Sequence, residues 1–103
     1  MNNTIKQAMS NSRNFYDNNL DTALKEIETK ILTVSKEGDT FIVLNPEGLG
    51  SYKYQKLLQK NEEQFLEDIL DHLELPAKCL SRMHDVNGKL ISLRIDWSDV
   101  DDK

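Results

Sequence analysis

Apolar residues recur at spacings of three and four through residues 5–34, which is the pattern of one face of an amphipathic helix. The middle of this stretch holds Asp17-Asn18-Asn19, which are poor helix formers, although the apolar spacing does not change there. The pattern therefore predicts either one long helix of about 30 residues or two helices, and we favour a break or kink at these three residues. Gly38 is expected to end the helical region as a left-handed cap.

A strand and a second helical region follow. Residues 40–44 are a continuous β-branched and apolar run, which predicts a strand covered on both faces. Pro and Gly residues mark a loop at 46–50, and helical spacing resumes over residues 51–73. Asn61, with Gln64 three residues later, has the spacing of a capping box and predicts a restart or kink inside this region.

The C-terminal part of the chain predicts a β-hairpin. Asn87-Gly88 is the strongest short hairpin signal, because a type I′ turn needs two residues with positive φ. Apolar and polar residues then alternate over 91–97, as in a half-buried strand. A two-residue turn places three pairs opposite each other: His84 with Ile91, Arg82 with Leu93, and Leu80 with Ile95. The partner strand is poorer in apolar residues, so we expect it at an edge of the sheet.

These elements predict a single small α+β domain over residues 1–103. It comprises a helical arm (1–36), a β-α-β-β unit (40–97) and an acidic tail (98–103). A helix joins the first two strands, so they should run parallel, with the last strand between them and antiparallel to both. The expected architecture is a small three-stranded mixed sheet covered by helices on one face.

Composition and charge narrow the function classes. The 103 residues are 38% hydrophobic and carry a net charge of −5, with +1 over residues 1–36, −6 over 37–77 and zero over 78–103. No basic cluster matches nucleic acid or an anionic membrane, so direct binding to either is not expected. No apolar run has the ~18 residues of a membrane span, and the N-terminus lacks a secretory apolar segment. We expect a cytoplasmic protein with no cofactor and no metal.

The second helical region carries an acidic row, defined as Glu63, Glu67, Asp71 and Glu74. Their spacings of four, four and three align them on one side of a helix. The row is either a docking surface for a basic partner or a solvated face that keeps the protein soluble.

The apolar stripe of the arm is long for a three-stranded sheet to cover. We therefore expect homo-oligomers that associate through this stripe. The proposed self-association face comprises Ile5, Met9, Tyr16, Leu20, Leu24, Ile27 and Ile31.

Four other patterns are compatible with metal binding, catalysis, ligand binding or nucleic-acid binding, but each also has an ordinary structural explanation. Asp68 and His72 have helical ligand spacing but no obvious third ligand, and Cys79 lacks a nucleophile motif around it. The glycine-rich residues 48–51 precede a helix, which leaves a small-ligand or nucleotide-binding module as an alternative. Aromatic and basic residues interleave over 52–60, which leaves a nucleic-acid-associated regulator as another. No residue is expected to be catalytic.

The layout of the chain resembles small accessory proteins encoded by bacteriophages and prophages. The matching features are the apolar stripe 5–34, the strand and helix at 41–44 and 65–73, Asn87-Gly88, and Ile95-Asp96-Trp97 near the C-terminus. This resemblance implies a non-enzymatic inhibitor, anti-CRISPR-like, that binds and blocks a bacterial host or antiviral-defence protein in the cytoplasm of the bacterial cell. It assigns no catalytic residue.

Overall fold

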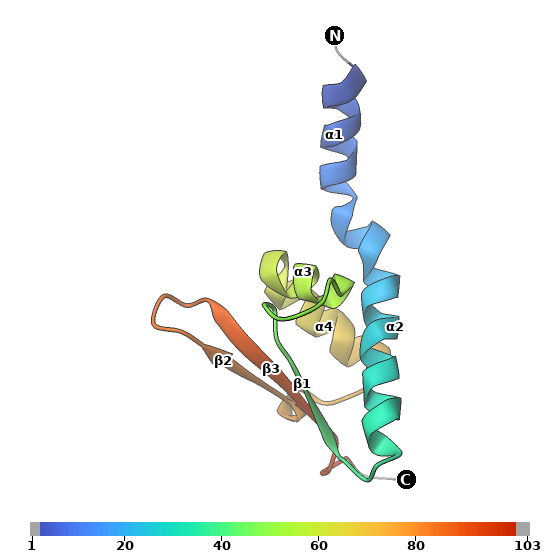
Figure 1. The fold of residues 1–103 in the computed structure, drawn as a ribbon, viewed down its shortest axis with the longest axis vertical. Helices are drawn as coiled ribbons and strands as arrows, with labels where there is room; N and C mark the ends of the chain where they lie inside the picture. The colour runs from blue at the N-terminus through green and yellow to red at the C-terminus, as the bar shows by residue number, and fades with distance from the viewer. Residues whose placement is uncertain (1–2, 101–103) are drawn as a thin grey trace.

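A computed structural model describes residues 3–100 and shows an α+β fold, as the sequence predicts (Figure 1). The elements follow one another in this order: α1 (Asn3–Arg13), α2 (Phe15–Ser35), β1 (Phe41–Leu44), α3 (Lys53–Lys60), α4 (Glu62–Leu73), the 3₁₀ turn η1 (Ala77–Cys79), β2 (Leu80–His84) and β3 (Leu90–Asp96). Residues 101–103 of the predicted acidic tail lie outside the described residues.

The three strands form one sheet in the order β1-β3-β2, so the last strand is central, as predicted. Both pairs are antiparallel. The two outer strands point the same way but β3 separates them, so no parallel pair forms. The sheet is antiparallel throughout, and the expectation of a mixed sheet was wrong in this respect.

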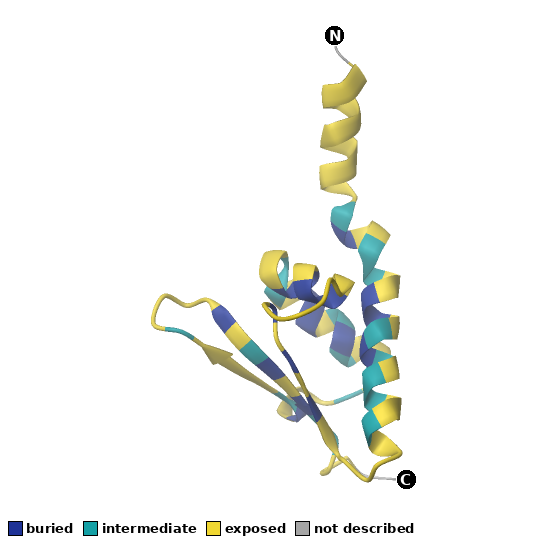
Figure 2. Ribbon diagram, viewed as in Figure 1, coloured by how far each residue is buried: buried dark blue, intermediate teal, exposed yellow. Residues whose placement is uncertain are grey.

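The helices α2, α3 and α4 lie on one face of the sheet and enclose the core with it (Figures 1 and 2). The largest fully buried side chains are Ile27, Leu44, Leu57, Leu58, Phe65, Ile69, Leu93 and Ile95. In β1, Ile42 and Leu44 point into this core, whereas Phe41 and Val43 on the other face are 39% and 44% exposed. The prediction that this strand is covered on both faces was wrong, because no described helix packs on the outer face.

The N-terminal region is two helices, and they separate at Asn14 rather than at Asp17-Asn18-Asn19. The helix α2 continues through the three poor helix formers, and the side chain of Asn19 donates to the carbonyl oxygen of Phe15 at 2.7 Å. Tyr16 is buried at the start of α2, so contact with the core holds the helix where propensity alone favours a break. The helix α1 buries no residue and extends away from the body (Figure 2).

The ends of the helices follow the predicted glycine and asparagine positions. Gly38 has φ 89°, and the next N–H, of Asp39, donates to the carbonyl oxygen of Val34, so the left-handed cap is confirmed. The helices α3 and α4 meet at Asn61, which confirms the predicted restart. The Asn61 side chain forms no cap hydrogen bond, so the capping box expected there was wrong.

The hairpin turn differs from the predicted type I′ turn. The N–H of Asp85 donates to the Lys89 carbonyl oxygen and the N–H of Gly88 to that of Asp85, which leaves a three-residue loop over 86–88. Gly88 has φ 83° but Asn87 does not have a positive φ, so the turn requires only one left-handed residue. The Asp85 carboxylate accepts the N–H groups of Asn87 and Lys89, each at 2.9 Å, and this bonding stabilises the alternative turn.

The strand register is partly as predicted. Leu80 pairs with Ile95 and Arg82 with Leu93, as expected, but His84 pairs with Leu90 and not with Ile91. A bulge between Met83 and His84 absorbs the extra residue that the longer turn introduces. The side chains of Arg82 and His84 therefore lie on the same face of β2 as Leu80, toward the helices.

Candidate functional site

The candidate site is the exposed side of α4, which carries the acidic row. The opposite side of α4 is fixed in the core by Phe65, Leu66 and Ile69. Residues three and four apart lie on one side of a helix, so this anchoring directs the acidic row to the surface. Glu63, Glu67, Asp71 and Glu74 are all exposed.

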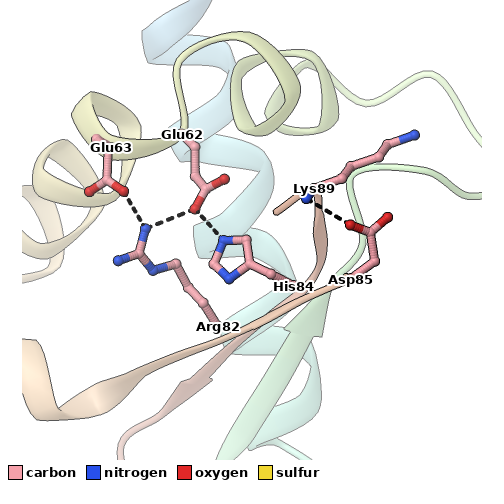
Figure 3. Close-up of polar contacts among 6 residues, drawn as sticks. All are labelled: Glu62, Glu63, Arg82, His84, Asp85 and Lys89. Atoms are coloured by element: carbon pink, nitrogen blue, oxygen red, sulfur yellow. Dashed lines mark hydrogen bonds and ion pairs between the residues drawn. The ribbon is translucent and has the colours of Figure 1, made fainter. Parts of the chain in front are cut away.

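Two side chains of β2 bond the acidic first turn of α4 (Figure 3). Arg82 donates from Nη1 to Glu62 Oε2 at 2.8 Å and to Glu63 Oε1 at 2.6 Å. The ring of His84 lies with Nε2 at 2.9 Å from the same Glu62 oxygen. Glu63 therefore has a partner within the chain, and the structure separates it from the other three members of the acidic row.

The pKa of Glu62 reflects this pairing. Partial burial of the Glu62 carboxyl opposes its charge, but the hydrogen bonds from His84 and Arg82 outweigh that effect and hold its pKa below the ordinary value. The bonds to Glu63 and Glu62 raise the pKa of Arg82. These groups hold β2 against α4. Their shifted pKa values result from this pairing and do not indicate a catalytic pair.

Two further side chains of α4 hold it against α2. The Tyr16 hydroxyl donates to Asp68, and His72 contacts Glu28. Burial, followed by the hydrogen bond to Asp68 and the charge of that carboxylate, raises the pKa of Tyr16. Asp68 and His72 have the spacing of metal ligands, but each contacts a different residue of α2. Within residues 3–100, no three His, Cys, Asp or Glu side chains gather as a metal site.

Three members of the acidic row remain unpaired. Glu67, Asp71 and Glu74 form no ion pair within residues 3–100. Glu74 lies just beyond the helix as a left-handed C-cap with φ 55°. Their three negative charges face solvent. Such an arrangement attracts a positively charged surface over a long range.

The predicted self-association face divides into two parts. Five of its members lie in or against the core of their own chain: Tyr16, Leu24 and Ile27 are buried, and Leu20 and Ile31 pack on them. The expectation that these five are available to a partner was wrong, because α2 uses them to cover α3, α4 and the sheet. Ile5 and Met9, on α1, are 58% and 51% exposed and remain available.

The aromatic and basic residues over 52–60 do not form a stacking surface. Tyr54 is buried, and its ring stacks on that of Tyr52 at a centroid distance of 5.2 Å. Lys30 lies 5.5 Å from the centre of the Tyr52 ring. These rings pack on each other and on α2, so the structure offers no row of free aromatic faces to a nucleic acid strand.

The glycine-rich residues 48–51 lie on the surface beside a shallow groove of about 340 Å³. Gln59 donates from its side chain to the Pro46 carbonyl oxygen at 2.6 Å, and Lys89 contacts Glu47. These contacts tie the loop to α3 and to the hairpin turn. Cys79, at the end of η1, is a buried free thiol, and His84 contacts Glu62 rather than this thiol.

The contacts of Arg82 and His84 with α4 were not predicted from the sequence. Their partners lie 19 to 22 residues away along the chain, so no local motif marks them. The one available signal was the strand alternation, which places Leu80, Arg82 and His84 on one face.

Comparisons of the chain with protein-family models, with curated proteins and with solved structures gave no match. Over the described part of the chain, no helix combines the length and the apolar content that crossing a membrane requires.

Proposed function

We propose that this chain is a non-enzymatic protein-interaction module that docks a basic surface of another protein through Glu67, Asp71 and Glu74. The observation that supports this proposal is the contrast within the acidic side chains of α4 and its C-cap: Glu62 and Glu63 bond Arg82 and His84, whereas Glu67, Asp71 and Glu74 are exposed and form no ion pair with another described residue. Like charges at these spacings weaken a helix by a few tenths of a kcal/mol per pair. An interaction that uses them would account for that cost.

The class of partner follows from the resemblance to phage-encoded accessory proteins. On that basis we propose a bacterial host or antiviral-defence protein, which the chain blocks by occupying a basic surface in the bacterial cytoplasm. A positively charged surface is common where such proteins contact nucleic acid phosphates, and a row of carboxylates is complementary to it.

A pull-down from a bacterial lysate with quantitative mass spectrometry tests the proposal. The bait proteins are the wild type, Glu67→Lys/Asp71→Lys, and the matched control Glu37→Lys/Asp39→Lys, which changes the same charge in the exposed turn after α2. We expect a partner captured by the wild type and the control but reduced at least tenfold with the α4 variant.

Surface plasmon resonance on the captured partner then separates docking from a solvated face. Long-range attraction acts mainly on the association rate constant, so this constant should fall in the α4 variant and, for the wild type, as salt rises. The fold should survive, because these side chains lie opposite Phe65 and Ile69 in α4. Rate constants equal to those of the wild type at both low and high salt would refute the proposal.

A further inference from the structure

The hairpin loop carries Asn87, the only asparagine of the chain that precedes a glycine. Such a pair is chemically reactive, because the main-chain nitrogen of the glycine can approach the side-chain amide of the asparagine without a side chain of its own in the way. The main-chain hydrogen bonds of the loop account for the shape of the turn. They do not involve the side chain of Asn87.

The Asn87 side chain is free to react. Asn87 and Gly88 are both exposed, on a loop that projects from the body of the molecule (Figures 1 and 2). The main-chain N–H of Asn87 donates to the Asp85 carboxylate at 2.9 Å, whereas its side-chain amide forms no hydrogen bond with any residue from 3 to 100. A Cβ at Gly88 would meet no atom within 4 Å. The amide can therefore rotate, and there is open space beside its neighbour.

The turn opposes this reaction while it is closed. The N–H of Gly88 donates to the Asp85 carbonyl oxygen at 3.0 Å, so the nitrogen that would attack is held. The Asp85 carboxylate also accepts the main-chain N–H of Lys89 at 2.9 Å (Figure 3). Hydrogen bonds in an exposed loop open locally far more often than those of the core. The reaction therefore proceeds from molecules in which the turn has opened.

We propose that Asn87 is a self-modification site, which Gly88 converts to aspartate and isoaspartate at a rate limited by opening of the turn. The Gly88 nitrogen forms a bond to Asn87 Cγ, the bond from Cγ to Nδ2 breaks, and Nδ2 leaves as ammonia with the Gly88 amide proton. Water then opens the imide ring. Addition of water at Cγ yields aspartate. Addition at the main-chain carbonyl carbon yields isoaspartate, in which the main chain runs through Cβ and Cγ.

The modification changes the hairpin and not the acidic row. Either product makes the net charge of −5 one unit more negative, beside the carboxylate of Asp85. Isoaspartate also lengthens the main chain of the loop over 86–88, so it disturbs the turn that aligns β2 with β3. The reaction needs water and no partner protein. Its failure would therefore leave the acidic docking proposal standing.

Peptide mapping of the purified full chain by mass spectrometry tests the site. Samples incubated for increasing times are digested, and the separated peptides report asparagine, aspartate and isoaspartate at position 87. We expect both products there, formed faster than at Asn11, which is also exposed but precedes Ser12. In Gly88→Asn, which suits a positive φ, the rate at position 87 should fall at least about tenfold, because a side chain obstructs the attacking nitrogen.

Three outcomes of this mapping would overturn the proposal. Equal rates at Asn87 and Asn11 would show that the glycine confers no special reactivity. An unchanged rate in Gly88→Asn would show that the nitrogen of residue 88 is not the attacking group. Aspartate without isoaspartate would indicate direct attack by water and no imide.

Unfolding and a substitution in the turn test whether opening limits the rate. The wild type in guanidinium chloride should be modified at least about tenfold faster than the folded chain, because no turn holds the nitrogen. Asp85→Ala removes the acceptor of the Asn87 and Lys89 N–H groups, so it should raise the rate in the folded chain. The control Asp99→Ala removes the same charge from an exposed position outside the hairpin and should leave the rate unchanged. Equal rates in the folded and unfolded chain, or no increase in Asp85→Ala, would overturn the limit set by the turn.

Discussion

At the scale of single residues, Glu62 joins two elements that are distant in the sequence. Its carboxylate receives Arg82 and His84 from β2 while its backbone belongs to the first turn of α4. An acidic side chain at a helix N-terminus is also favoured by the helix dipole. With about a fifth of its side chain exposed (21%), Glu62 is less screened by water than an ordinary surface carboxylate.

This environment predicts an acid-dependent loss of stability. Because the pKa of Glu62 is lower in the folded than in the unfolded state, its contribution is present above the unfolded value of about 4.3 and is lost as the pH falls through the lowered value. Glu62→Gln should cost about 1 kcal/mol near neutral pH. It should also make the free energy of unfolding fall less steeply between about pH 6 and pH 3.

Urea denaturation across this pH range measures the effect. Glu67→Gln is the matched control, since Glu67 forms no ion pair among the described residues, and its unfolding free energy should follow the wild type within about 0.5 kcal/mol. Equal acid dependence in Glu62→Gln and the wild type would mean that the pairing with Arg82 and His84 adds no stability.

At the scale of elements, the hairpin shows how a turn sets a register. The loop over 86–88 needs one left-handed residue, Gly88, and its extra residue is taken up by the bulge at Met83 and His84. Only His84 changes its partner in this register, since Arg82 pairs with Leu93 as it would with the shorter turn. Both side chains bond the first turn of α4.

A substitution at Gly88 tests this turn. Gly88 has φ 83°, and a Cβ added there would meet no atom within 4 Å, so the expected cost comes from the backbone conformation and not from a clash. Gly88→Val should lower the free energy of unfolding by more than about 1 kcal/mol, since β-branched residues resist positive φ. Gly88→Asn should retain most of the stability, because Asn adopts this conformation more readily. Equal urea midpoints for Gly88→Val and the wild type would contradict this account of the turn.

At the scale of the whole molecule, one core supports an exposed arm. The side chains of α2, α3, α4 and the inner face of the sheet meet around Phe65, which has no exposed surface. The helix α1 contributes nothing to this core. Changes in α1 should therefore leave the core intact, whereas changes near Phe65 should affect folding.

The substitution Phe65→Ala tests how much the core contributes to the stability of the fold. Removing a buried phenylalanine costs about 3–5 kcal/mol, which is a large part of the roughly 5–15 kcal/mol expected for a folded domain. We expect circular dichroism to show a large fall in thermal midpoint for Phe65→Ala. Phe41→Ala, on the open face of the sheet, should cost about 1 kcal/mol, because Phe41 is 39% exposed. Similar midpoints for the two variants would be incompatible with the core described for this fold.

The sequence by itself determined the types and order of the elements and the acidic row. These features depend on local rules: helical spacing, the glycine at 38, the restart at Asn61, and the spacing of Glu63, Glu67, Asp71 and Glu74 along α4. The central place of β3 was also predicted, as the simplest order in which the hairpin pairs β3 with β2 and β1 joins the other edge of β3.

Only the tertiary structure determined which residues of these patterns are buried or paired and which turn the hairpin adopts. The uninterrupted stripe of 5–34 could not show that burial begins at Tyr16, because that depends on where the body of the molecule ends. The acidic row could not show that Glu63 is paired and that Glu67 is not, because Arg82 lies on a distant strand. The hairpin signal could not distinguish the two turn types, since the Asp85 hydrogen bonds and the bulge form only when the strands pair. In the first two cases the deciding contact joins residues that are distant in the sequence, whereas the turn depends on strand pairing together with local hydrogen bonds to Asp85.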